Sequence, residues 1–89
     1  MSLILPYGNI YGAHVRYTAK DIGEIVRKAR KNLGVTQKAL ALTSGTGLRF
    51  VIDLEKGKET CQLGKVLTVL NTLGIGISLA PPSLPEKKG

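Results

Sequence analysis

Apolar residues recur at helical spacing in four segments of this chain, and the first two segments carry clear helix signals. Thr18 is a good N-cap, and the acid Asp21 three residues later resembles a capping box, so a helix should begin there. Gly34 is suited to the C-terminal end of this helix. Thr36 is the N-cap of a second predicted helix, which ends at Gly45 because glycine takes positive φ without strain. The apolar stripe of the first helix consists of Ile22, Ile25, Val26, Ala29 and Leu33.

A third helix is predicted from about Gly47 or Leu48 to Glu55, and Gly57 ends it. The fourth helix spans roughly residues 62–73. Glycine in a helix interior costs about 1 kcal/mol relative to alanine, and the sequence offers no reason for Gly64 in this helix. The apolar stripe of the fourth helix consists of Leu63, Val66, Leu67, Leu70 and Leu73.

Residues 75–80 alternate apolar with small side chains, and this period of two predicts a short β-strand. Its apolar face is formed by Ile75, Ile77 and Leu79. An unpaired strand edge is a liability, so we expect this face to be a dimer interface that pairs with its copy in a second subunit. Pairing with the N-terminal arm of the same chain is the alternative.

Length and composition restrict the class of protein. The chain has 89 residues, which suits one domain, and a core of this size favours dimerisation. Lys and Arg number 13 and Asp and Glu 6, so the formal net charge is +7, with a pI of about 9.9. This balance favours an anionic partner such as nucleic acid. We divide the chain into an N-terminal arm (1–17), a helical domain (18–74), a dimerisation strand (75–80) and a disordered tail (81–89).

Other classes of protein fit the sequence poorly. Aromatic residues make up 4% of the chain and Trp is absent, which disfavours single-strand binders that stack bases on aromatic rings. Cys61 is the only cysteine, so no intramolecular disulfide forms, and a reducing cytoplasm is the expected location. No segment approaches the roughly 20 apolar residues that span a bilayer, and the start of the chain does not resemble a signal peptide, so no membrane association is expected.

No pattern in the chain is typical of catalysis. His14 is the only histidine, and neither it nor Cys61 has a nearby partner motif. The acidic residues fit capping, surface and ion-pair roles. Glycine-rich phosphate loops, metal-spaced clusters and nucleophile motifs are absent from the sequence. We therefore expect no catalytic residue, no metal ligand and no cofactor.

Residues 35–57 have the layout of a helix-turn-helix, which lays its second helix in the major groove of double-stranded DNA. Val51 and Leu54 are three apart and share the core face, so Arg49 projects outward near the start of the helix. An arginine there suits a bidentate contact with guanine. The alternative is that Arg49 is only a solvated charge.

The remaining candidates lie around this helix. Leu48 or Ile52 would pack on a thymine methyl group, and Asp53 would either accept from cytosine or hold Arg49 in place. Gln37 suits a phosphate or adenine, and the free N–H groups behind Thr36 suit a phosphate. Lysines would add attraction that does not depend on sequence. The expected DNA-binding residues are Thr36, Gln37, Lys38, Gly47, Leu48, Arg49, Ile52, Asp53, Lys56 and Lys58.

The chain resembles the Xre or phage Cro/repressor helix-turn-helix family over residues 18–75. The resemblance implies a mainly α, lambda-repressor-like bundle of four to five helices with a short C-terminal β-strand, and a dimer bound to DNA. It also implies a largely buried structural ion pair between Arg30 and Glu55. Gly47 stands where the family often caps with Ser or Thr. Glycine is a weaker but acceptable cap, and Thr46 is the alternative. Ile52 stands where Ser is common. The motifs are Thr36-Gln37, Leu40-Ala41, Gly45, Val51, Leu54-Glu55, Gly57 and Leu73-Gly74.

Within this family the chain looks most like HipB-type antitoxins, through its small size, the run of residues 27–37 and the alternating segment after the last helix. The resemblance implies a HipA-type Ser/Thr kinase toxin as partner and repression of the shared operon. A phage-like regulator without a toxin is one alternative. Another is an antitoxin that acts mainly by protein contact, through the basic surface of Arg27, Lys28 and Lys31.

Overall fold

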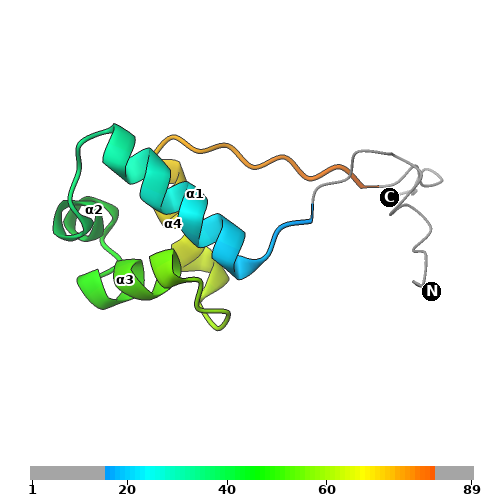
Figure 1. Ribbon diagram of the computed structural model, residues 1–89, viewed down its shortest axis with the longest axis horizontal. Coiled ribbons are helices and arrows are strands. Elements are labelled where there is room, and N and C mark those ends of the chain that lie inside the picture. Colours follow the sequence, from blue (N-terminus) through cyan, green and yellow to red (C-terminus); the bar gives the residue numbers. More distant parts are fainter. Residues whose placement is uncertain (1–15, 82–89) are drawn as a thin grey trace, which may run out of the picture.

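The computed structural model describes residues 16–81 and contains four α-helices in this range (Figure 1). They are α1 (Ala19–Asn32), α2 (Gln37–Ser44), α3 (Leu48–Lys56) and α4 (Leu63–Thr72). The four predicted helices are therefore confirmed. Most of the predicted arm, including His14, and all but the first residue of the predicted tail lie outside the described residues.

Side-chain caps determine where α1 and α2 begin. The Thr18 hydroxyl accepts from Asp21 N at 3.1 Å, and Asp21 Oδ2 accepts from Thr18 N at 2.9 Å, which closes the predicted capping box. These bonds from the Thr18 backbone and hydroxyl lower the pKa of Asp21 below its ordinary value. At the start of α2, the Thr36 hydroxyl accepts from Ala39 N at 3.0 Å.

The turn between α2 and α3 depends on two glycines with positive φ. Gly45 ends α2 in the left-handed region at φ 70°, and Gly47 is the N-cap of α3 at φ 98°. No side chain caps α3. Of the two predicted caps, Gly47 is the one found, and the alternative, Thr46, is wrong, because its hydroxyl lies 2.9 Å from the Ser44 hydroxyl.

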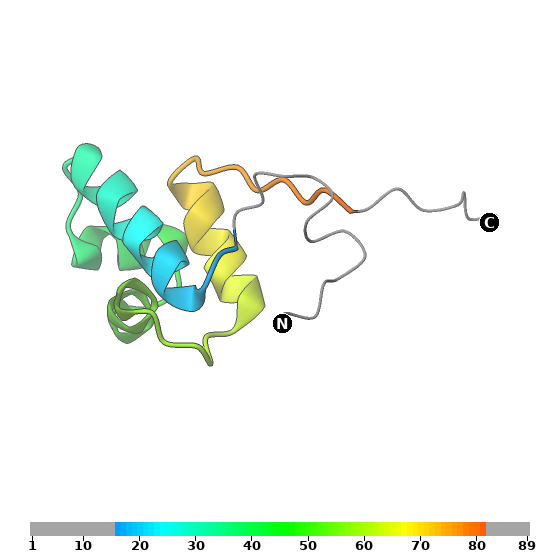
Figure 2. The same cartoon turned by 45° about the vertical axis from the view of Figure 1, so that its right-hand side comes forward.

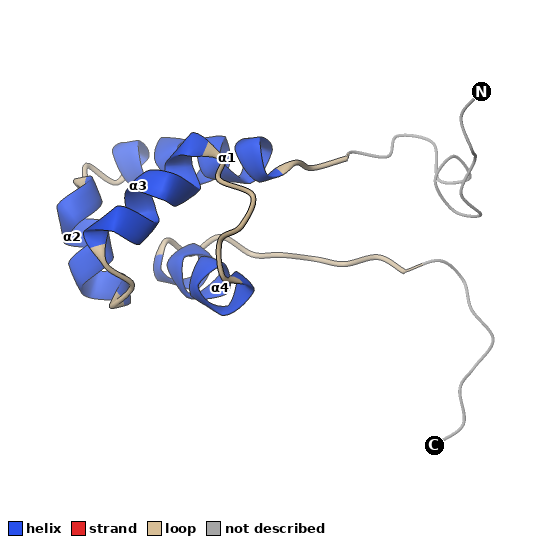
Figure 3. Ribbon diagram, turned by 90° about the horizontal axis from the view of Figure 1, so that it is seen from below, coloured by secondary structure: helices blue, strands red, loops and turns tan. Residues whose placement is uncertain are grey.

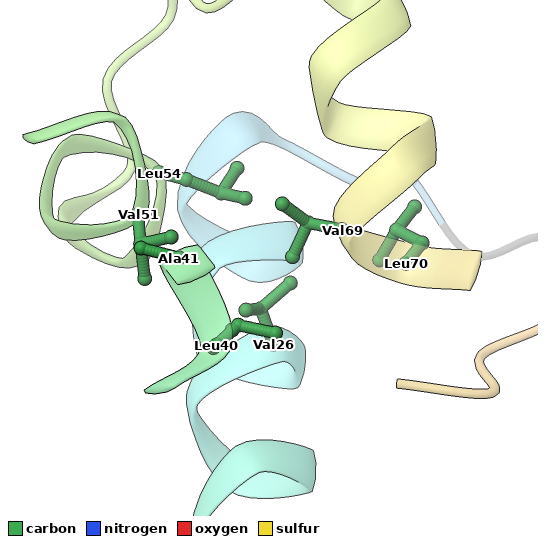
Figure 4. Close-up of a cluster of buried hydrophobic side chains, with 7 residues drawn as sticks. All are labelled: Val26, Leu40, Ala41, Val51, Leu54, Val69 and Leu70. Atoms are coloured by element: carbon green, nitrogen blue, oxygen red, sulfur yellow. The ribbon is translucent and has the colours of Figure 1, made fainter. Parts of the chain in front are cut away.

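The core is built from all four helices (Figure 4). α3 packs against α1 and α2, and α4 packs against α2. Burial of these side chains is the main force that holds helices of eight to fourteen residues together, since helices this short are marginal alone. The buried apolar residues are Val26, Leu40, Ala41, Val51, Leu54, Val69 and Leu70.

The apolar stripes are wider than the faces that the tertiary structure buries. Leu33, Leu63 and Leu67 are exposed although each belongs to a predicted stripe. Val69 lies outside the predicted apolar stripe of α4, yet it is fully buried. The face of α4 that meets α2 is centred on Val69 and Leu70, and helical periodicity alone does not select that centre.

The N-terminal half of α1 lies unusually close to the end of α3. A Cβ atom on Gly23 would overlap the carbonyl oxygen of Leu54 and would lie 2.9 Å from that of Glu55. A Cβ atom on Gly57 would lie 2.8 Å from Lys20 Cα. Glycine at both positions is therefore a packing requirement.

The predicted strand is absent from the described residues. Residues 75–81 run away from the bundle as an extended segment without strand pairing (Figures 1 and 2). Ile75 packs against the core, but Ile77 and Leu79 are 51% and 85% exposed. A β-strand exists only through hydrogen bonds to a neighbouring strand, and none lies beside this segment in the described part of the chain. Within residues 16–81, none of the helices has the length and apolarity to cross a membrane.

Candidate nucleic-acid interface

α2 and α3 form the helix-turn-helix, and Figure 3 looks onto the side of the molecule where α3 lies. One face of α3 packs in the core, and the other is exposed to solvent. Val51 and Leu54 are buried in the core, while the side chain of Arg49 is 77% exposed. Leu48 is exposed in the same first turn, and Ile52 is half-buried. Arg49 therefore projects outward near the start of α3, as the helical spacing indicates.

Arg30 and Glu55 form the ion pair that the family resemblance implies. Arg30 Nε donates to Glu55 Oε2 at 2.6 Å and Nη2 donates to Oε1 at 3.0 Å, a bidentate arrangement. The Glu55 side chain is only 4% exposed. The hydrogen-bonded carboxylate of Glu55 raises the pKa of Arg30 above its ordinary value.

Two further groups complete this buried cluster. Arg30 Nη1 donates to the carbonyl oxygen of Val35 at 2.8 Å, and Gln37 Nε2 donates to Glu55 Oε1 at 3.0 Å. Among the described residues, all buried side-chain nitrogen and oxygen atoms have hydrogen-bond partners. The cluster ties α1, the start of α2 and the end of α3 together, so it fixes the angle at which the helix-turn-helix is held.

The side chain of Gln37 has a structural partner, Glu55, that the sequence did not predict. The sequence places Gln37 among the DNA contacts, and in the structure one N–H of its amide group donates to Glu55. Its side chain is half-buried. The amide nitrogen carries two hydrogens, so one N–H and the carbonyl oxygen are left for another partner, and contact of Gln37 with a phosphate or adenine stays a prediction. The two partners are 18 positions apart in the sequence, so no local signal predicted this bond.

Asp53 contacts the two cations nearest to it. Arg49 Nη2 lies 3.4 Å from its Oδ1, and Lys58 Nζ lies 3.5 Å from its Oδ2. The contact with Arg49 agrees with one of the two roles that the sequence allows for Asp53, and the other, a bond from cytosine, stays a prediction. The remaining candidates, Thr36, Lys38, Gly47 and Lys56, are exposed on α2, on α3 and at the turn.

Two features of this surface were not anticipated. Leu42 is 83% exposed on α2 and borders a shallow apolar hollow together with Lys38 and Leu48. Lys65 of α4 lies over the Phe50 ring, with Nζ 5.8 Å from the ring centre. Within residues 16–81, no group of three or more His, Cys, Asp and Glu side chains is placed to hold a metal ion.

A comparison with curated proteins decides the family. The chain is 52% identical over 70 residues to the uncharacterized HTH-type transcriptional regulator y4mF of Sinorhizobium fredii (strain NBRC 101917 / NGR234). The match covers 79% of this chain and 92% of the relative. The chain belongs to the HTH-type transcriptional regulators. No protein-family model matches it.

Solved structures agree on the fold of this HTH-type regulator. It superposes on a HipB–O4 20mer complex with a TM-score of 0.68 and on HipB in a HipA–HipB–O2–O3 complex with a TM-score of 0.69. Each match covers 79% of this chain and 99% of the other, at 18% sequence identity. The HTH-type regulator therefore shares the fold of HipB, and the resemblance noted in the sequence is confirmed at that level.

Proposed function

We propose that this regulator is a sequence-specific repressor that binds double-stranded DNA as a homodimer, with α3 in the major groove. The exposed Arg49 in the first turn of α3 carries the proposal. The opposite face of the same helix is committed to the core and to the Arg30 pair. An exposed guanidinium at this place suits a bidentate contact with guanine.

The other exposed groups have consistent roles. Leu48 and Ile52 flank Arg49 and suit the methyl group of thymine. Lys38, Lys56 and Lys58 suit phosphates, and the free backbone N–H groups of the first turn of α2, which Thr36 caps, suit another. The fold likeness to HipB, which one solved structure contains in complex with an O4 20mer, supports this arrangement. The site of action would be the cytoplasm.

The extended segment after α4 supports the homodimer. Ile77 and Leu79 are exposed, and with Ile75 they border an apolar groove against Tyr17 and Ile25. In the proposed dimer, residues 75–80 pair as a strand with the same residues of a second copy. That pairing supplies the hydrogen bonds that the segment lacks within one chain and removes the exposed apolar edge.

A HipA-type Ser/Thr kinase toxin is the proposed protein partner, with repression of a shared operon. The fold likeness to a solved HipA–HipB–O2–O3 complex supports this step. A regulator without a toxin is the alternative. The neighbouring gene separates the two: a kinase-like open reading frame there, whose co-expressed product forms a stable complex with this chain on size exclusion, is expected only for the antitoxin.

Arg49→Ala tests the recognition helix. The probe is a duplex that the full chain enriches from a random-sequence library, compared with a scrambled duplex of the same composition. Arg49→Ala should weaken binding to the selected duplex by about tenfold, because a bidentate contact discriminates by about 1–3 kcal/mol. Arg27→Ala, on the exposed face of α1, is the matched control and should leave the preference intact. Unchanged preference in Arg49→Ala would show that α3 is not the reading element.

A further inference from the structure

The Asp53 carboxylate of α3 contacts two basic side chains, Arg49 and Lys58. Asp53 is one helical turn beyond Arg49, and its side chain is 17% exposed. Its Oδ1 is 3.4 Å from Arg49 Nη2, and its Oδ2 is 3.5 Å from Lys58 Nζ. The two oxygens of a single carboxylate therefore face two cations, one from the first turn of α3 and one from the loop that follows the helix.

The backbone holds this arrangement in place. Gly57 ends α3 in the left-handed region at φ 88°, which turns the chain back so that Lys58 N donates to Asp53 O at 3.0 Å. Lys58 is thus tied to Asp53 through both its main chain and its side chain. The residue after Asp53 in α3 is Leu54, which is buried in the core and fixes this part of the helix. The carboxylate is the fixed point, and the two longer side chains are oriented toward it.

An exposed ion pair adds little to folding stability, so the arrangement calls for a reason other than stability. A guanidinium has five N–H donors, and the contact of Nη2 with Asp53 leaves others directed at solvent. Restraining a long side chain before binding lowers the entropy that is lost when it docks. In a complex with DNA, the Asp53 carboxylate would repel the phosphates. When Arg49 bonds no base, this repulsion is not offset, so such complexes are disfavoured.

We propose that Asp53 is a positioning and specificity-determining residue: it orients Arg49 toward the bases and Lys58 toward the backbone, and its charge weakens binding to DNA that lacks the preferred sequence. This inference rests on the proposed function. It assigns Asp53 no contact with a base. The residue acts on discrimination through Arg49, so its effect should depend on the presence of that side chain.

Asp53→Asn should change the affinity for scrambled DNA and the preference for the selected duplex in opposite directions. Affinity for a scrambled duplex should rise by about twofold to threefold at low salt, because one repulsive charge is removed. The ratio of selected to scrambled affinity should fall by about fivefold or more, since a misdirected Arg49 loses part of its discrimination. Glu59→Gln is the matched control: it removes one negative charge from an exposed loop position near Lys58. It should raise both affinities together and leave their ratio unchanged.

A double-mutant cycle tests the inference with the full-length chain and the two duplexes named above. We expect Asp53→Asn to lower the ratio in the wild-type background and to leave it unchanged in the Arg49→Ala background. Thermal unfolding of each variant verifies that the fold is intact. A ratio that falls equally in both backgrounds would overturn the inference in favour of direct base contact by Asp53. An Asp53→Asn variant that behaves like Glu59→Gln would overturn it as well. If the full chain enriches no sequence, or Arg49→Ala leaves the ratio unchanged, the proposed function itself fails.

Discussion

Arg30 and Glu55 lie 25 residues apart in the sequence, yet two parallel hydrogen bonds of 2.6 and 3.0 Å join their side chains. The pair fastens α1 to the last turn of α3, and Gln37 adds the start of α2 through its own bond to Glu55. α3 is thus held at its C-terminal end by a buried charge cluster. Its N-terminal end, where Arg49 lies, remains open to solvent.

Breaking this pair should destabilise the protein strongly. Glu55→Gln leaves the Arg30 guanidinium buried without a counter-charge, at an expected cost of about 3–5 kcal/mol in the free energy of unfolding. Urea denaturation followed by circular dichroism measures this cost. Glu59→Gln removes the same charge from an exposed position and should change stability by less than about 0.5 kcal/mol. Equal effects of the two substitutions would contradict a structural role for the pair.

Two helical glycines should respond in opposite directions to alanine. Gly23→Ala places a Cβ atom against the backbone of Leu54 and Glu55, which cannot retract, so we expect a loss of about 1–3 kcal/mol or more. Gly64→Ala meets open space on α4 and should stabilise by about 0.5–1 kcal/mol. Thermal melts of the two variants test this directly, and a loss of stability in Gly64→Ala would reveal a role that the packing does not show.

The capping box should make part of the stability of α1 depend on pH. Hydrogen bonds from Thr18 lower the pKa of Asp21, so its contribution is fully present above the ordinary pKa of an aspartate. The contribution is lost as the pH falls through the lowered pKa. Asp21→Ala should therefore lower Tm at neutral pH, and the difference from wild type should shrink below about pH 4.

Glu24→Ala is the control for this effect, since Glu24 is an exposed residue of the same helix. Its difference from wild type should be small at both ends of the pH range. A Tm difference for Asp21→Ala that stays constant down to acidic pH would contradict the assignment of the effect to the charged carboxylate.

The proposed dimer depends on the exposed apolar residues after α4. Replacing both Ile77 and Leu79 with serine should convert the dimer to a monomer, because the strand pair loses its apolar face. Analytical ultracentrifugation measures the mass. Leu42→Ser is the matched control, because Leu42 is 83% exposed and Leu79 is 85% exposed. Leu42→Ser should leave the dimer intact. A wild-type chain that sediments as a monomer at all concentrations would exclude the dimer.

Local chemistry made most of the helix-turn-helix predictable. Thr18 and Thr36 cap their helices through residues three positions away, and Gly45 and Gly57 end helices through their own φ angles. Such signals act over one helical turn, so the amino-acid sequence determined by itself where α1 and α2 begin and where α2 and α3 end. The outward direction of Arg49 also followed from spacing within a single helix.

Only the tertiary structure decided which groups meet across helices. The bond of Gln37 to Glu55 and the packing of Gly23 on Leu54 join residues distant in sequence, and their geometry depends on how α1, α2 and α3 cross. The conformation of residues 75–80 also depends on contacts with other parts of the structure. Alternation makes it suitable for a strand, but a strand forms only where a second one supplies hydrogen bonds. The sequence specifies each element through neighbours along the chain, whereas contacts between elements depend on the packing of the whole.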